Sequence, residues 1–132
     1  MSAAAAALCI GLLGTAAPVA AVPAPAFTLS WTHSVEKVVW RESYVLHPDG
    51  LHLTEAAVQG TGAGMEPPPE ARRVDGWYVY APDRMVPEIV IPDSAFTAAM
   101  TLCAAGRCAP VSTWAQRAVA DVRPVRLWPC DG

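Results

Sequence analysis

The sequence predicts an all-β domain, a small antiparallel sandwich or partly open barrel, with one short helix near the C-terminus. Apolar and polar residues alternate with a period of two in several short runs, which is typical of half-buried strands. The 13 prolines and nine glycines among the 132 residues interrupt the chain often and favour short strands over long helices. The length fits one domain, and the net charge of −3 argues against a nucleic-acid partner, because nucleic-acid-binding proteins normally present a basic face.

The first 26 residues have the pattern of a signal peptide or an N-terminal membrane anchor. Residues 3–17 are continuously apolar or small, and this length suits the apolar part of a signal peptide better than a membrane-spanning helix. Ala24-Pro25-Ala26 resembles a cleavage site and Val19-Ala20-Ala21 is a second candidate, although no basic residue precedes the apolar run. We therefore expect a periplasmic or other extracytoplasmic protein with one all-β domain at residues 27–132, tethered to the membrane if the segment is not cleaved.

The first two predicted strands form a hairpin. Residues 27–33 alternate between apolar and polar side chains. In residues 38–46 one strand face carries Val38, Trp40, Glu42, Tyr44 and Leu46, so one carboxylate lies among aromatic residues. A turn at residues 34–37 pairs Trp31 with Trp40, which brings the two apolar faces to the same side of the sheet.

The third predicted strand, residues 51–59, follows the turn His47-Pro48-Asp49-Gly50. Proline suits the first central position of a type I turn, and Gly50 can supply the left-handed residue of a bulge. This turn pairs His47 with Leu51.

Two registers of the third strand remain open. In the register that the turn favours, Arg41 lies beside Glu55 on one face, which is a favourable cross-strand arrangement. A four-residue loop pairs Leu46 with Leu51 instead and buries more apolar surface, but it sets Glu42 opposite Glu55, and opposed like charges are unfavourable. We expect the first register.

The rest of the chain predicts further short strands and the helix. The expected strand segments are residues 74–80, in which an Asp-Gly turn leads into an aromatic strand, and residues 85–91, 96–102 and 125–130. Prolines on both sides of the second of these predict an edge strand. Residues 112–122 are the expected helix, because Trp114, Ala118 and Val122 recur every four residues after a Ser-Thr pair that can cap it.

The cysteines predict one disulfide bond. A two-residue Ala105-Gly106 loop would pair Ala104 with Arg107 and place Cys103 opposite Cys108 in an antiparallel hairpin, within disulfide range. Cys130 can tie down the C-terminal tail, stay free or pair between chains, and Cys9 lies in the predicted leader. The spacing is not a standard zinc pattern, so neither a metal site nor a cofactor is expected.

A candidate binding site lies where the first hairpin turn and a glycine-rich loop are expected to meet. Strand three runs antiparallel to strand two, so the loop returns to the end where strand one finishes. The loop's backbone N–H groups, the Lys37 charge and the titratable His33 suit a carboxylate or another anion. Alternatively, the turn residues only satisfy the backbone of the loop. The candidate ligand-binding residues are His33, Ser34, Glu36, Lys37, Gly60, Gly62, Ala63, Gly64 and Met65.

Two motifs, Trp31-Thr-His-Ser-Val-Glu-Lys37 and Gly60-Thr-Gly-Ala-Gly-Met-Glu-Pro-Pro68, resemble those of an uncharacterised bacterial family, domain of unknown function 1850. The resemblance extends from about Phe27 to the C-terminal cysteine. It implies a small exported protein, often encoded beside tripartite (TRAP-type) transporters with TAXI-type solute receptors. The partners that it implies are a transporter subunit or its solute receptor, and a small anionic solute is a further expected ligand.

Two classes of function follow from these observations. The first is a non-enzymatic accessory of a solute transporter that binds a small anion or a partner protein. The alternative is a small periplasmic metal-dependent or hydrolytic enzyme. His33 and Ser34 are adjacent in a strand and point to opposite faces, so they do not form a catalytic pair directly. His47 and His52 bracket a turn and could hold a metal together with Glu42 or Glu55.

Overall fold

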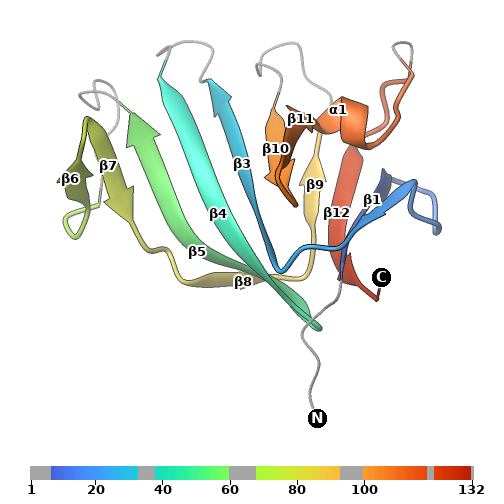
Figure 1. Ribbon diagram of the computed structural model, residues 1–132, viewed down its shortest axis with the longest axis horizontal. Helices are drawn as coiled ribbons and strands as arrows, with labels where there is room; N and C mark the ends of the chain where they lie inside the picture. Colours follow the sequence, from blue (N-terminus) through green and yellow to red (C-terminus); the bar gives the residue numbers. More distant parts are fainter. Residues whose placement is uncertain (1–6, 33–37, 60–67, 93–99, 119–120, 132) are drawn as a thin grey trace.

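The computed structural model describes residues 7–32, 38–59, 68–92, 100–118 and 121–131. These residues form two antiparallel β-sheets and one short helix, which confirms the predicted fold class (Figure 1). The described strands do not close into a barrel.

The larger sheet has the strand order β11-β10-β3-β4-β5-β7-β6, and β8 pairs with β5 beside this path. Its strands are β3 (Ala26–Thr32), β4 (Val39–His47), β5 (Gly50–Gln59), β6 (Arg72–Val74), β7 (Trp77–Tyr80), β8 (Arg84–Val86), β10 (Thr101–Ala104) and β11 (Arg107–Pro110). Trp31 pairs with Trp40 between β3 and β4, as the sequence predicts.

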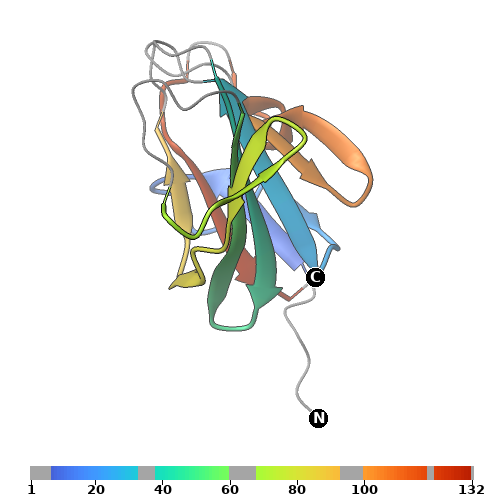
Figure 2. The ribbon, with the colours of Figure 1, turned by 90° about the vertical axis from the view of Figure 1, so that its left-hand side faces the viewer.

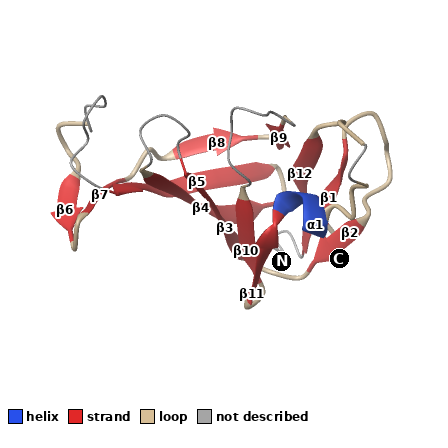
Figure 3. Ribbon diagram, turned by 90° about the horizontal axis from the view of Figure 1, so that it is seen from above, coloured by secondary structure: helices blue, strands red, loops and turns tan. Residues whose placement is uncertain are grey.

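The smaller sheet has the order β2-β1-β12-β9. Its strands are β1 (Ala7–Leu12), β2 (Ala20–Val22), β9 (Ile89–Ile91) and β12 (Val125–Cys130). Seen from above, β1, β2 and β12 gather with the helix at one end of the molecule, whereas β6 and β7 lie at the other (Figure 3). The side view shows β9 and β12 on one side of β4 and β5 (Figure 2).

The expected single strand at residues 85–91 is two strands that belong to different sheets. β8 pairs with β5 in the larger sheet and β9 pairs with β12 in the smaller one. Pro87 lies between them, and because proline has no N–H to donate to a ladder, it suits the point where the chain leaves one sheet for the other.

The core lies between the two sheets. Leu8 and Ile10 of β1 and Leu127 of β12 are fully buried, and they belong to the same cluster as side chains from the larger sheet. The fully buried leucines of the larger sheet are Leu29, Leu46, Leu51 and Leu102.

The segment predicted to be a leader therefore supplies a central strand of the smaller sheet. β1 pairs with β2 on one side and with β12 on the other. Cys9 is bonded to Cys130, which ties β1 to the end of β12. None of the described helices is long and apolar enough to cross a membrane. Cleavage after Ala26, or after Ala21, stays a prediction.

Strands β4 and β5 combine both of the registers that the sequence left open. Near the turn Leu46 pairs with Leu51, so the expectation that His47 pairs with Leu51 is wrong there. A β-bulge at Thr54 then shifts the pairing by one residue, and Glu55 lies opposite Ser43 instead of Glu42. The bulge buries the leucines of both strands and also avoids the opposition of two carboxylates.

Gly50 is needed for a close approach between strands and not for a left-handed backbone. Gly50 does not have a positive φ, so it is not the left-handed bulge residue that the sequence predicts. A Cβ at this position would lie 2.8 Å from the carbonyl oxygen of Val86. The left-handed turns occur instead at Asp75-Gly76 and Ala105-Gly106, each within a tight hairpin.

The helix is a single turn, α1 (Val111–Trp114), and the expected extent of 112–122 is wrong. Gln116 has a left-handed φ of 51°, which ends the helix one residue after its C-cap. The indole Nε1 of the buried Trp114 donates to the Leu102 carbonyl at 2.9 Å and fixes α1 against β10.

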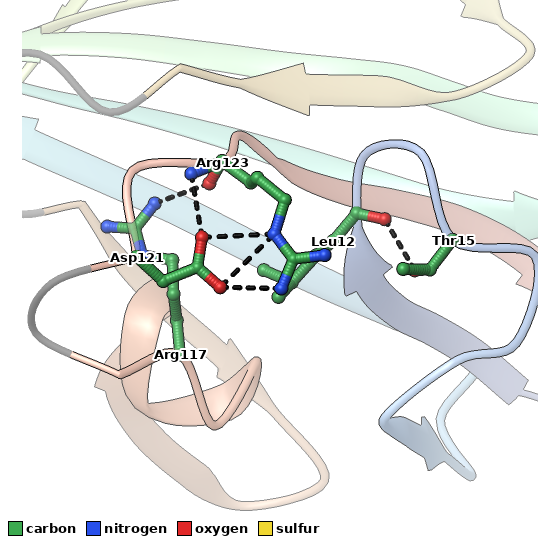
Figure 4. Close-up of polar contacts among 5 residues, drawn as sticks. All are labelled: Leu12, Thr15, Arg117, Asp121 and Arg123. Atoms are coloured by element: carbon green, nitrogen blue, oxygen red, sulfur yellow. Dashed lines mark hydrogen bonds and ion pairs between the residues drawn. The ribbon is translucent and has the colours of Figure 1, made fainter.

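After α1, polar contacts stabilise the segment that leads to β12. Arg123 contacts the Asp121 carboxylate with Nε and Nη2, the shortest distance being 2.6 Å, and these hydrogen bonds lower the pKa of Asp121 to about 2. Arg117 donates to the Arg123 carbonyl, as Figure 4 shows. The neighbouring β1–β2 turn is closed by Thr15 Oγ1, which donates to the Leu12 carbonyl at 2.6 Å (Figure 4).

Candidate functional site

The predicted ligand-binding residues lie outside the described part of the chain. This holds for His33, Ser34, Glu36, Lys37, Gly60, Gly62, Ala63, Gly64 and Met65. Their proposed roles therefore stay predictions, and the structure is informative about the strands that flank them.

The strands that flank the two motifs end at the same edge of the larger sheet. Thr32, the last residue of β3, pairs with Val39, the first residue of β4. Gln59 ends β5, and its neighbour Val58 pairs with Trp40. Figure 1 shows the ends of β3 and β5 and the start of β4 together at the top of the molecule. The chain thus enters and leaves the first motif segment, and enters the second, within one short stretch of this edge.

An aromatic row crosses the larger sheet at this edge. Trp31, Trp40, Val58 and Tyr78 are successive cross-strand partners on β3, β4, β5 and β7, so their side chains share one face. The Trp31 and Trp40 rings are stacked, with centroids 6.2 Å apart. Trp40 Nε1 is buried and has no hydrogen-bond partner among the described residues. This indole N–H is a donor that a ligand acceptor could satisfy.

Guanidinium groups flank the aromatic row. Arg73 lies over the Tyr78 ring and donates through Nη1 to its hydroxyl at 3.2 Å. On the opposite face Arg41 lies over the Trp77 ring, 4.7 Å from its centroid. The edge therefore combines half-buried aromatic side chains with positive charge, which suits an anionic group.

The Glu42 carboxylate lies on the same face of the sheet as the aromatic row, two residues after Trp40 along β4. The Tyr44 hydroxyl donates to Glu42 Oε1 at 2.9 Å. Burial raises the pKa of Tyr44 well above its usual value, and the Glu42 charge adds to this effect. Burial and then the Glu42 charge also raise the pKa of Tyr80. The sequence placed Glu42 among aromatic residues, but the hydrogen bond depends on the rotamer of Tyr44 and had no signal in the sequence.

Replacing Tyr44 with Phe tests this buried pair. At pH 7 we expect Tyr44→Phe to lower the free energy of unfolding by about 1–2 kcal/mol, because Glu42 loses its donor in a partly buried site. Since the folded pKa of Tyr44 is raised, its stability contribution is complete below the unfolded value of 10.0 and is lost as pH rises above it. Denaturant unfolding of wild type should therefore show a loss of stability above pH 10 that is reduced in Tyr44→Phe.

The matched control is Tyr78→Phe, which removes a hydroxyl that accepts from an exposed arginine. At pH 7 it should cost less than Tyr44→Phe, because the Arg73 guanidinium can hydrogen-bond water instead. An equal alkaline loss in wild type and Tyr44→Phe would contradict the role assigned to Tyr44.

The histidines of the alternative enzyme hypothesis lie at the opposite end of β4 and β5. The His47 and His52 rings approach each other, with centroids 5.7 Å apart, as the turn suggested. His52 Nε2 contacts Asp83 Oδ1 at 2.6 Å. Glu42 instead accepts a hydrogen bond from Tyr44, and Glu55 lies opposite Ser43. Within the described residues no group of three or more histidine, cysteine or acidic side chains could hold a metal ion. The structure therefore does not bring His47 and His52 together with either glutamate.

A shallow hollow of about 530 Å³ lies on the outer face of the larger sheet, beside the β10–β11 hairpin. We call it the outer groove. Its lining includes Thr28, Ser43 and Val45 of the sheet and both cysteines of the hairpin. Cys103 and Cys108 form the predicted disulfide bond, with Cα atoms 4.1 Å apart.

The fold and these features define a small two-sheet β protein that is cross-linked by two disulfide bonds. The sequence model of a protein family, the domain of unknown function DUF1850, matches residues 27–111. The chain belongs to this family. No curated protein and no solved structure matches the chain.

Proposed function

We propose that this protein is a non-enzymatic extracytoplasmic accessory of a tripartite TRAP/TAXI-type solute transporter, and that it binds an anionic group through the edge that carries both motifs. The anionic group belongs to a small solute or to an acidic side chain of a transporter subunit or solute receptor. The observation that supports the proposal is the convergence of the flanking strands, because Thr32, Val39 and Gln59, which border the two motif segments in the sequence, lie at one edge of the sheet.

Three further features support this proposal. The edge holds aromatic side chains with guanidinium groups, and the indole N–H of Trp40 has no hydrogen-bond partner within the described ranges. All four cysteines of the chain are in disulfide bonds, which persist in oxidising compartments outside the cytoplasm. The transporter association itself rests on the family resemblance.

The test is capture of transporter components by the tagged protein from the extracytoplasmic fraction and from detergent-solubilised membranes. We expect wild type to retain a subunit or solute receptor, and Lys37→Ala and Gly62→Val to lose it. Arg72→Ala is the matched control, since it removes one exposed positive charge from β6 and should leave capture unchanged.

Capture has to be compared at equal folded fractions, measured by circular dichroism. If Lys37→Ala and Gly62→Val lower stability but their folded fractions retain the partner fully, the motif residues are structural and the proposed binding edge is wrong. Turnover of a substrate by the purified protein would instead favour the hydrolytic alternative.

A further inference from the structure

The two disulfide bonds differ in exposure and in the length of chain that they close. Cys9 is 3 % exposed, Cys130 is half-buried, and their bond spans 121 residues. Cys108 is exposed, Cys103 is half-buried, and their bond spans five residues. Exposed disulfides are the ones that react readily, whereas buried ones resist attack by thiols.

The exposed bond also faces a space that a ligand can enter. Cys103 pairs with Thr28 of β3, and Thr28 pairs with Ser43 of β4, so these side chains share the outer face. The outer groove is lined by both cysteines and by the exposed hairpin tip from Ala105 to Arg107. A thiol held in the groove therefore lies next to the disulfide.

The surrounding strands do not depend on the bond. β10 pairs with β3 on its other side over four residues, from Thr101 to Ala104. The Ala105-Gly106 turn already has the left-handed φ values that a tight hairpin requires. Opening the bond therefore leaves the hairpin in place, with two thiols next to each other.

We propose that Cys103–Cys108 is a thiol–disulfide exchange site, and that its substrate is a thiol-bearing peptide or protein segment that lies in the outer groove. This activity goes beyond the proposed accessory function and does not depend on it. Cys9–Cys130 is the structural bond of the fold and takes no part in the exchange.

The exchange proceeds in two balanced steps. A substrate thiolate attacks the exposed Sγ of Cys108, the Cys103–Cys108 bond breaks, and Cys103 leaves as a thiolate that takes a proton from water. A second substrate thiolate then attacks the substrate sulfur of the mixed disulfide and releases Cys108, which is also protonated. Two substrate thiols are thereby oxidised to one disulfide, and Cys103–Cys108 is reduced to two thiols by the same two electrons.

The experiment treats the native full-length protein with reduced glutathione, a small peptide thiol, over a range of concentrations. Free thiols are then alkylated and located by peptide mapping, while circular dichroism monitors the fold. We expect Cys103 and Cys108 to become labelled at a glutathione concentration at least about tenfold below that which opens Cys9–Cys130. In Cys103→Ala, the Cys108 thiol should react with added oxidised glutathione, releasing one reduced glutathione, and the mixed disulfide should persist because no neighbouring cysteine is left to displace it. Equal opening of both bonds, or opening of Cys103–Cys108 only after unfolding, would overturn the proposal.

A second pair of variants tests the groove. Val45→Trp fills the floor of the outer groove, and Val74→Trp places the same side chain at an exposed position on β6. We expect Val45→Trp to slow reduction by glutathione at least about threefold and to slow reduction by a thioredoxin-type dithiol protein more strongly, while Val74→Trp leaves both rates unchanged. If Val45→Trp slows neither reductant, the groove is not the place where the thiol binds and that part of the proposal is wrong.

Discussion

A chain that begins at Phe27 is expected to lose the cooperative fold of the full chain. This truncation removes β1 and β2, leaves β12 paired with β9 alone and leaves Cys130 without a partner. Leu8 and Ile10 are fully buried, and each contributes about 1.5–3 kcal/mol by burial. Together with the lost disulfide, this approaches the whole stability of a small domain, about 5–15 kcal/mol.

The measurement is thermal unfolding followed by near-ultraviolet circular dichroism, which reports the packing of the tryptophans. The matched control begins at Ala7, since it keeps every described strand and should unfold like the full chain. If the Phe27 chain unfolds cooperatively at the same temperature as the full chain, the assignment of β1 to the core is wrong. N-terminal sequencing of the exported protein is the complementary test of cleavage after Ala26.

The Cys9–Cys130 bond is expected to contribute far more to stability than the Cys103–Cys108 bond. In the chain-entropy account a bond that closes a 121-residue separation contributes about 5 kcal/mol, and one that closes five residues contributes about 2 kcal/mol. We therefore expect the double variant Cys9→Ala with Cys130→Ala to lower the free energy of unfolding about twice as much as Cys103→Ala with Cys108→Ala.

Guanidinium unfolding of the two double variants measures this difference directly, because each serves as the control for the loss of two cysteines. Removing both partners leaves no free thiol that could form a wrong bond. A larger loss from the hairpin pair than from the Cys9–Cys130 pair would show that β1 is not held as the structure indicates.

The strands of the first hairpin could be predicted closely because local periodicity determines them. Residues 27–33 alternate between apolar and polar side chains, and residues 38–46 place their aromatic residues on one face. Strands β3 and β4 lie within one residue of these limits. The hairpin disulfide followed from the same local reasoning, since a two-residue turn places Cys103 opposite Cys108.

The register of β5 could not be predicted in this way, because it depends on two opposing requirements. Pairing Leu46 with Leu51 improves burial, and separating Glu42 from Glu55 reduces repulsion. A uniform ladder meets one requirement and fails the other, whereas the bulge at Thr54 meets both. The free-energy change that a bulge causes depends on the packing of both sheets, and the sequence of one strand does not determine that packing.

The candidate site also combines features that the sequence predicted with features that only the structure shows. The sequence predicted the motif residues and the direction of β5, so the convergence of the flanking strands followed from topology alone. The hydrogen bond between Tyr44 and Glu42 and the buried N–H of Trp40 depend on how side chains pack across the sheet.

Local pattern in the sequence was enough to determine the fold class, the first hairpin, the last strand and the Cys103–Cys108 bond. The tertiary structure decided the role of residues 7–12, because a continuous apolar run satisfies both a signal peptide and a strand buried on both faces. Only the presence of β12 beside it, with its complementary ladder and Cys130 within bonding distance of Cys9, gives this run a place in the core.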